Sequence, residues 1–354
     1  MQLYNNLSAK ERAALIEKAG KDRLTISFYK YAKIKNTELF RNHLFLAWND
    51  LDVLGRIYIA HEGINAQLSI PADNFQKFKD HLDSISFLEN VRLNIAIEHD
   101  NFAFLKLKVK VRDKIVADGL NDDTFDVTNK GVHVDAEEFN TLIEDPNTIL
   151  VDMRNHYESE IGHFKNAITP DVDTFRESLD LIEEDLKDHK EDKKLVMYCT
   201  GGIRCEKASA YYKHKGFKQV FQLEGGIINY VRQVKTKGLD NKFIGKNFVF
   251  DERRSERISD DVIAKCHQCG KPADLHTNCA NEACHLLFIQ CDECKAQMEN
   301  CCSSSCMEIN RLPYAEQKVL RKGQGNSNDI FKKGRADHLP YKKDLRNIFE
   351  VLKK

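Results

Sequence analysis

Two hydrophobic periods alternate along the first 120 residues. A period of two, typical of half-buried strands, covers residues 24–31, 55–60, 64–70, 91–98 and 103–116. Helical spacing covers residues 8–19, 36–50 and a segment opened by Pro71. The order β-α-β-β-α-β predicts a ferredoxin-like (acylphosphatase-like) domain over residues 1–120. One side of the second helix should hold Leu39, Phe40, His43, Leu44 and Ala47.

The pattern changes after residue 128, where short apolar strands alternate with helices. The strands are predicted at 132–134, 149–152, 195–198 and 216–223. A helix is predicted at 136–143, and the charged stretch 171–193 should be a solvated helix and loop. This alternation predicts a parallel α/β domain over residues 128–240, with helices on both faces of the sheet and functional residues at the carboxyl ends of its strands.

The last strand of the first domain has a basic face. Its apolar residues point to the core, and its other face carries Lys106, Lys108, Lys110, Arg112 and Lys114. Like charges in one row repel, so a phosphate backbone is one expected partner. A solvated strand edge that resists pairing is the other interpretation. The segment Glu62-Gly63-Ile64-Asn65 likewise is either functional or a plain turn between strands.

Overall charge favours no class of partner, but the cysteines do favour a metal. The chain has 354 residues, a formal net charge of −1 and eleven cysteines, of which nine lie between Cys266 and Cys306. Its first residues lack a secretory pattern, and no apolar run reaches membrane-spanning length. We therefore expect a cytoplasmic protein without a membrane segment, in which clustered cysteines bind metal more readily than they form disulfides.

The cysteine-rich segment, residues 241–310, contains four ligand groups that predict structural zinc. The expected ligands are Cys266, Cys269, Cys279, Cys284, Cys291, Cys294, Cys301 and Cys306. Two zinc ions would each take four ligands, with the first and third groups on one ion. Cys302 is then spare, and His276 or His285 could replace a cysteine. Redox disulfides and reduced structural thiols are the alternatives. The basic tail 311–354 either binds RNA or is solvated.

One loop carries most of the expected chemistry. Cys199 follows a buried strand, four residues separate it from Arg204, and a helix begins nearby. Backbone N–H groups of such a loop, backed by the helix dipole, favour a thiolate, and the thiol pKa can fall to roughly 3.5–7.5. Cys199 and Arg204 are the catalytic candidates. The remaining loop residues are Thr200, Gly201, Gly202, Ile203 and Cys205.

Two roles stay open for each neighbour of Cys199. Arg204 either orients the loop or meets a phosphate, and Cys205 is either a resolving thiol or the start of the helix. The short loop suits a single sulfur or oxygen atom. It resembles the active-site loop of a rhodanese domain, and so do Val151-Asp152-Met153-Arg154 upstream and Leu223-Glu224-Gly225-Gly226-Ile227 downstream. Met153 replaces the usual valine, which is a mild apolar change.

The whole chain resembles a more specific group. A ferredoxin-like domain with Glu62-Gly63-Ile64-Asn65, the Cys199 loop and the cysteine block together resemble the bacterial tRNA uridine hydroxylase family. The resemblance implies oxygen-dependent hydroxylation of the wobble uridine at carbon 5, with molecular oxygen as co-substrate, a tRNA anticodon stem-loop as partner and Cys199 as the catalytic cysteine. The thiolate would add to carbon 6 of the uracil, or would carry an activated oxygen or sulfur atom.

Two rival functions remain. The loop by itself favours a sulfurtransferase that carries a persulfide on Cys199. A non-catalytic adaptor that binds zinc and RNA is the second rival. The sequence contains no flavin or nicotinamide fingerprint and no evident iron site, so it does not explain how oxygen is activated.

Overall fold

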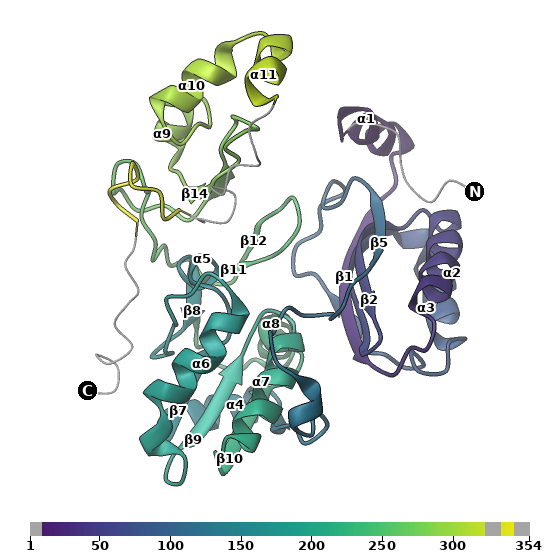
Figure 1. The fold of residues 1–354 in the computed structure, drawn as a ribbon, viewed down its shortest axis with the longest axis vertical. Helices are drawn as coiled ribbons and strands as arrows, with labels where there is room; N and C mark the ends of the chain where they lie inside the picture. The colour runs from purple at the N-terminus through teal and green to yellow at the C-terminus, as the bar shows by residue number, and fades with distance from the viewer. Residues whose placement is uncertain (1–8, 323–333, 343–354) are drawn as a thin grey trace.

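The computed structural model describes residues 9–322 and 334–342 and divides into three parts (Figure 1). An N-terminal sheet with its helices is purple to blue, a middle α/β part is teal, and a cysteine-rich part is green. None of the helices in these ranges is both long and apolar enough to cross a membrane.

The N-terminal part is ferredoxin-like, as predicted. Its elements are α1 Ala9–Ala19, β1 Arg23–Tyr31, α2 Thr37–Asp50, β2 Leu54–Ala60, β3 Gly63–Pro71, α3 Phe75–Asp83, β4 Asn94–Ile95 and β5 Leu107–Val111. The strand order is β4-β1-β3-β2-β5, in which β5 runs parallel to β2 and the other pairs are antiparallel. Helices α2 and α3 cover one face through Leu44, Trp48 and Phe78. The opposite face of the sheet turns toward the middle part.

Two details of that prediction were wrong. Leu39 is 66% exposed, because it shares an outward side of α2 with His43 while the buried side carries Leu44, Phe45 and Trp48. The last two strands are shorter than predicted, and β5 ends at Val111. The N–H of Arg112 still donates to the carbonyl of Ile59 in β2, and beyond it side chains hold the backbone at Ile115.

The middle part is a parallel sheet with helices on both faces, which confirms the predicted architecture. Its main elements are β6 Val132–Val134, α4 Ala136–Glu144, β7 Thr148–Asp152, α5 His156–Ser159, α6 Phe175–Asp185, β9 Lys194–Tyr198, α7 Ile203–His214, β10 Gln219–Leu223 and α8 Gly226–Lys237. The order is β6-β10-β9-β7. Helices α6 and α7 cover one face, and α4 and α8 the other. The stretch 171–193 is therefore not simply solvated, since Phe175, Leu179 and Ile182 enter the core.

The remaining elements are short, and most of them belong to the cysteine-rich part. They are β8 Gly162–Phe164, β11 Phe243–Phe248, β12 Ser255–Arg257, β13 His276–Asn278, β14 Leu287–Ile289, α9 Asp292–Gln297, α10 Ser304–Arg311 and α11 Tyr314–Arg321. Three 3₁₀ turns complete the described elements: Ala72–Asn74, Asp122–Thr124 and Lys187–His189. Strand β11 pairs with β8 and with β12. Of the basic tail predicted over 311–354, residues 323–333 and 343–354 lie outside the described residues.

Candidate active site

Cys199 lies at the carboxyl end of β9, where the chain turns into α7. Its side chain is fully buried, and the backbone N–H of Gly202 donates to its Sγ at 3.2 Å. Gly202 has a φ of +99°, and a Cβ there would lie 2.9 Å from the hydroxyl of Tyr29. Glycine is therefore required both by the loop conformation and by the close approach of the N-terminal sheet.

The Cys199 thiol is activated by its own loop. Burial by itself raises the pKa of the thiol, but four effects oppose it: a hydrogen bond with the Cys205 thiol, the positive charge of Arg204, and the backbone N–H groups of Cys205 and Gly202. The net result is a pKa of about 6 for Cys199. Burial and the neighbouring Cys199 raise the pKa of Cys205, which stays protonated as the donor. A thiolate at neutral pH is a nucleophile.

Arg204 is committed to a partner inside the protein. Its guanidinium forms a bidentate pair with Glu158, at 2.7 and 2.8 Å, and the Glu158 side chain is fully buried. The backbone N–H of Asn155 also donates to Glu158, at 3.0 Å. A paired and buried guanidinium orients the loop, which is one of the two roles predicted for Arg204, and its contact with a phosphate stays a prediction.

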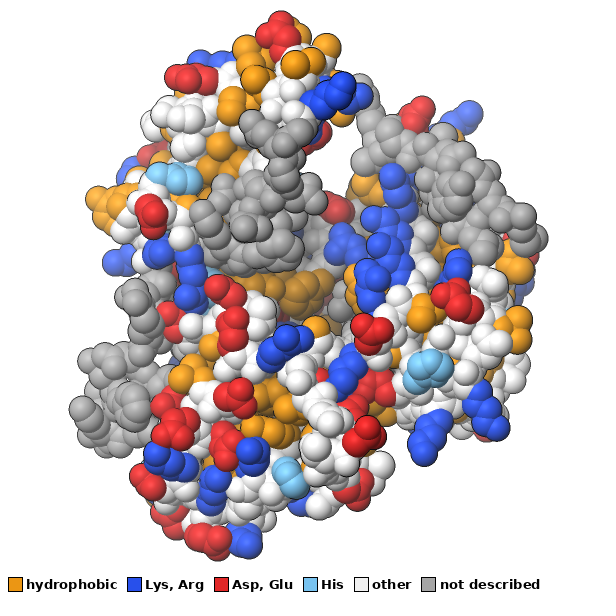
Figure 2. Space-filling model, in the orientation of Figure 1, with side chains coloured by type: hydrophobic (Ala, Val, Ile, Leu, Met, Phe, Trp, Pro, Cys, Tyr) orange, Lys and Arg blue, Asp and Glu red, His pale blue; other side chains and the backbone are white. Residues whose placement is uncertain are grey.

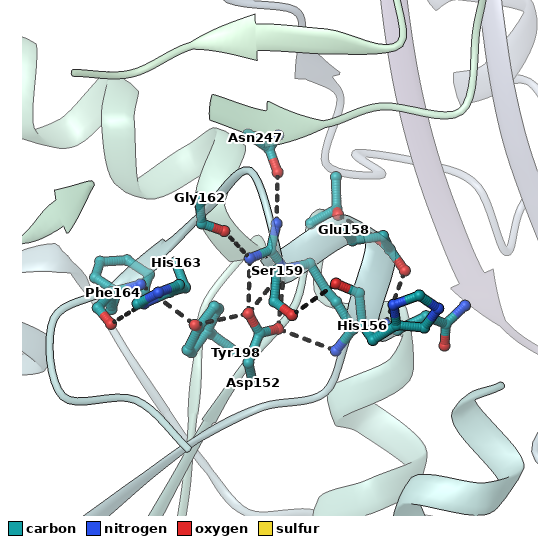
Figure 3. A network of polar contacts seen from close by, with 12 residues as sticks. Asp152, His156, Glu158, Ser159, Gly162, His163, Phe164, Tyr198 and Asn247 are labelled. Carbon is teal, nitrogen blue, oxygen red and sulfur yellow. Dashed lines mark hydrogen bonds and ion pairs between the residues drawn. The ribbon is translucent and has the colours of Figure 1, made fainter. Parts of the chain in front are cut away.

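A second buried network holds the strand that leads to Cys199. Asp152 accepts a hydrogen bond from the hydroxyl of Tyr198 at 2.8 Å and pairs with Arg154 at 2.7 Å. Arg154 also donates to the carbonyl of Gly162 at 2.6 Å. Figure 3 shows Asp152 and Tyr198 in this network beside the short helix that carries Glu158. The motif Asp152-Met153-Arg154 thus fixes the position of the residue before Cys199.

The glycine turn after β10 packs directly against the backbone of the loop that carries Cys199. The N–H of Ile227 donates to the carbonyl of Cys199 at 3.0 Å. Gly226 has a φ of +65°, and a Cβ there would lie 2.4 Å from the same carbonyl. The turn therefore requires glycine so that α8 can begin directly against the loop that carries Cys199.

Cys199 lines a cavity of about 410 Å³ between the middle part and the open face of the N-terminal sheet. This volume lies within the range of about 300–1,000 Å³ that is typical of ligand sites. The sheet contributes Ser27, Tyr29, Arg56, Tyr58, Asn65 and Gln67. The sequence analysis named only Asn65 among them, within the segment Glu62-Gly63-Ile64-Asn65, and it missed the other five as site residues. Their signal was present, because they alternate with core residues on strands whose opposite face is covered by helices.

The basic row begins on the same face of the sheet as the cavity. In the strand register, Asn65 lies beside Tyr58, and Tyr58 lies beside Lys110. The next row places Arg56 beside Lys108. Because directly paired residues point to one face, the lysines of β5 extend the cavity wall outward. Figure 2 shows a stripe of Lys and Arg side chains over β5, beside the hollow of the molecule.

The five predicted members of the row do not form one continuous charged face. Lys108 and Lys110 are exposed within β5, and Lys106 and Arg112 flank it. Lys114 lies beyond the strand and pairs with Asp118 at 2.6 Å and Asp122 at 2.9 Å. Lys114 is therefore wrong as a member of the row, because its charge is neutralised inside the protein.

The segment Glu62-Gly63-Ile64-Asn65 covers the end of the turn after β2 and the first three residues of β3, and it also joins the parts of the molecule. Glu62 accepts a hydrogen bond from the N–H of Ile115 at 2.8 Å, and the Asn65 amide donates to the carbonyl of Ile115 at 3.1 Å. Glu62 also pairs at 2.7 Å with Lys207 of α7, which is 2% exposed. The side chains of Glu62 and Asn65 thus hold the chain after β5, and Glu62 connects the turn to α7.

The structure sorts eight cysteines into two groups. One group is Cys266, Cys269, Cys291 and Cys294, and the other is Cys279, Cys284, Cys302 and Cys306. In each group the four sulfur atoms lie within 4.8 Å of one another. The predicted interleaving therefore appears, but Cys302 takes the place expected for Cys301. Neither His276 nor His285 belongs to a group.

The sulfur spacing fits a tetrahedral metal site. Sulfur–sulfur distances are 3.6 Å between Cys269 and Cys291, and 3.7 and 3.8 Å from Cys302 to its neighbours Cys284 and Cys306. Four thiolates at about 2.3 Å from one zinc ion would stand about 3.8 Å apart. A disulfide needs about 2.05 Å, and every cysteine in this structure is free.

Comparison with known proteins decides the family. The chain is 55% identical over 334 residues to a protein of Photorhabdus laumondii named tRNA uridine(34) hydroxylase, which covers 94% of this chain and 95% of that protein. A protein of Leptospira interrogans with the same name is 55% identical over 320 residues, which is 90% of this chain and 87% of its own. The chain belongs to the tRNA uridine(34) hydroxylase family. A solved rhodanese-like domain from Anabaena sp. covers 36% of this chain and 87% of its own, at 19% identity and a TM-score of 0.26.

Three family models locate the parts of this tRNA uridine(34) hydroxylase family member. A UPF0176 acylphosphatase-like domain matches residues 23–115, a rhodanese-like domain matches 135–233, and a rhodanese C-terminal region matches 244–307. Each matched region contributes a residue to the cavity. Asn65 comes from the first region, Cys199 from the second and Phe250 from the third. The site is thus a composite of all three regions.

Proposed function

We propose that this protein hydroxylates uridine 34 of tRNA at carbon 5, with molecular oxygen as co-substrate. One observation carries the proposal: the activated thiol of Cys199 opens into a cavity whose far wall continues into exposed lysines. A neutral small-molecule sulfur acceptor would not need that basic edge. The names of the relatives supply the position of the uridine.

The Cys199 thiolate acts by adding to carbon 6 of the uracil ring. The new C–S bond pushes electron density to carbon 5, which then attacks an oxygen atom derived from molecular oxygen. Loss of the carbon 5 proton and expulsion of the thiolate restore the ring. The balance is one uracil, one molecule of oxygen, two electrons and two protons in, and one 5-hydroxyuracil and one water out. A separate reductant supplies the two electrons.

The anticodon stem-loop binds along the edge of the N-terminal sheet. Lys108 and Lys110 neutralise phosphates, and Arg56 lies between them and the cavity. Wobble nucleotides lie in a single-stranded loop, so the base is taken from its stack at a cost of only a few kcal/mol. The enzyme works in the cytoplasm, where free cysteines are stable.

Two structural zinc ions hold the cysteine-rich part. The eight cysteines of the two groups are the ligands, and thiolates at this spacing are the donors that zinc prefers. Zinc would cross-link segments that otherwise form only short strands and helices, and Phe250 of the cavity packs against the same hydrophobic cluster as Cys266 and Cys294.

Wobble nucleosides from a deletion strain test the function. We expect mass spectrometry to show that an added oxygen atom disappears on deletion, returns with the wild-type gene and stays absent with Cys199→Ser. Loss of an added sulfur atom instead would establish a sulfurtransferase. Full rescue by Cys199→Ser, with failure of variants of the zinc ligands, would establish a non-catalytic adaptor.

A further inference from the structure

The wall opposite Cys199 carries one amide whose orientation is fixed by the fold. Asn65 is half-buried on β3 and lines the cavity from the N-terminal sheet, whereas Cys199 lines it from the middle part. Tyr29 and Tyr58 flank Asn65 on the two neighbouring strands. The residue thus lies in the centre of the sheet face that meets the catalytic loop.

The carbonyl of Ile115 determines which way this amide points. A backbone carbonyl only accepts hydrogen bonds, so the side-chain nitrogen of Asn65 must face it, and the distance is 3.1 Å. Ile115 cannot move away, because Glu62 binds its N–H at 2.8 Å. Within residues 9–322 and 334–342, no group donates a hydrogen bond to Oδ1 of Asn65. The cavity wall therefore presents a fixed acceptor.

A fixed acceptor distinguishes uracil from cytosine. Atom N3 of uracil carries a hydrogen and donates, whereas N3 of cytosine has a lone pair and accepts. Carbon 6 lies directly across the pyrimidine ring from N3. The thiolate approaches carbon 6 from one face of the ring, whereas N3–H points away from carbon 6 in the plane of the ring. A uracil that extends from Cys199 toward the N-terminal sheet therefore directs N3–H toward Asn65, which lines the sheet side of the same cavity.

We propose that Asn65 recognises the uracil base by accepting a hydrogen bond from N3–H, and that it excludes cytosine by placing its oxygen against the N3 lone pair. This inference rests on the proposed function. It gives Asn65 the role of a specificity residue that contacts the substrate, and it gives Glu62 and Ile115 the role of fixing its orientation.

Binding of RNA under conditions that prevent the reaction tests the proposal. We would measure the Kd of anticodon stem-loops that carry U34 or C34, without oxygen, for the wild-type protein and for Asn65→Ala. A good base contact discriminates by about 2 kcal/mol, so wild type should prefer U34 by about 30-fold. In Asn65→Ala the preference should fall below about threefold, because U34 loses a partner and C34 loses a repulsion.

Two further variants separate recognition from folding. Asn65→Asp keeps an acceptor at the site and should keep a U34 preference above about tenfold, although both affinities fall. Asn74→Ala is the matched control, because the Asn74 amide also donates to a backbone carbonyl, that of Leu51 at 3.0 Å, but lies outside the cavity. It should retain the wild-type preference. Folded Asn65→Ala and Asn74→Ala should alkylate at Cys199 at the wild-type rate, whereas the new carboxylate of Asn65→Asp should slow alkylation by disfavouring the thiolate.

The outcomes distinguish this inference from the proposed function. An unchanged U34 preference in Asn65→Ala, or an equal loss in Asn74→Ala, overturns recognition by Asn65 while the hydroxylase function stands. A wild-type protein that neither prefers U34 nor modifies it overturns both.

Discussion

Cys199 is a buried thiol whose reactivity depends on neutral donors as much as on charge. Burial disfavours the thiolate, and the opposing donors are the Cys205 thiol and two backbone N–H groups, with Arg204 adding its positive charge. Because Arg204 is itself paired with Glu158, its field at the sulfur is partly offset. The thiol of Cys205 should therefore matter for activity even though it forms no covalent bond.

The pH dependence of alkylation tests whether the Cys205 thiol lowers the pKa of Cys199. Because the pKa of Cys199 is lowered to about 6, the thiolate is present above pH 6 and is lost below it. We expect the rate of iodoacetamide modification, followed on the Cys199 peptide by mass spectrometry, to have its midpoint near that pH. In Cys205→Ala the midpoint should move upward, and a midpoint one pH unit higher slows modification about tenfold at acidic pH. An unchanged midpoint would show that Cys205 is not the donor.

At the scale of elements, β5 combines two roles. Its apolar residues complete the core of the N-terminal sheet, and its lysines continue the cavity wall. Strand β5 is an edge strand, so exposed lysines also protect it from pairing with other chains. The two interpretations of the basic row are therefore compatible, and salt dependence separates the contribution of RNA binding.

Salt dependence of tRNA binding measures the contacts made by β5. The double variant Lys108→Ala and Lys110→Ala should weaken binding and make the slope of log K against log salt shallower by about 1.4–1.8, since each phosphate contact contributes about 0.7–0.9. Lys218→Ala removes a lysine whose side chain is 61% exposed on the middle part, and it is the control. Equal slopes for the wild type and the double variant would contradict binding along β5.

The cysteine-rich part offers a second test at this scale, through a matched pair of neighbours. Cys302 belongs to a four-sulfur group, and Cys301 does not. We expect metal analysis to find about two zinc ions per wild-type chain, two in Cys301→Ser and about one in Cys302→Ser, because each ion needs four ligands. Loss of zinc in Cys301→Ser with retention in Cys302→Ser would contradict the grouping.

Sequence periodicity predicted the elements better than their ends. Both sheets and their helices follow from periods of two and 3.6, because each element must bury one face. The end of β5 depends instead on Ile115, which Glu62 and Asn65 hold from a different strand pair. The choice of Cys302 over Cys301 likewise depends on where the chain turns in space. Both features depend on residues that are far apart in the sequence, so neither leaves a local sequence pattern.

For the whole molecule, the first turns of α7 form the junction of the two walls of the cavity. Glu206 accepts a hydrogen bond from the hydroxyl of Tyr29 at 3.0 Å, and Lys207 pairs with Glu62 at 2.7 Å and with Asp122 at 2.5 Å. The cavity itself was not predictable from the sequence, because it depends on how these parts sit against each other. The catalytic loop was predictable, since its residues are contiguous.

Lys207 should therefore act as a positioning residue. Lys207→Met leaves Glu62 without its cation, so the wall that carries Asn65 should shift against Cys199. A displacement of about 1 Å can cost about 100-fold in rate, so kcat should fall steeply. The alkylation rate of Cys199 should stay unchanged, because its donors lie within the loop.

The control for that variant is Lys187→Met, which removes a lysine whose side chain is 53% exposed and paired with Glu184. It should have wild-type kcat and wild-type alkylation. Retained activity in Lys207→Met, or a parallel loss of Cys199 alkylation, would contradict a positioning role for the junction.

The central claim is that Cys199 directs an oxygen atom from molecular oxygen to carbon 5 of the wobble uridine. The most direct measurement incubates the purified protein and a reductant with a tRNA that contains U34, under isotopically heavy dioxygen, and analyses the nucleosides by mass spectrometry. We predict that the wild-type protein yields 5-hydroxyuridine that carries the heavy oxygen, and that Cys199→Ser leaves the uridine unmodified. Light oxygen from water, an added sulfur atom, or modification by Cys199→Ser would contradict that claim.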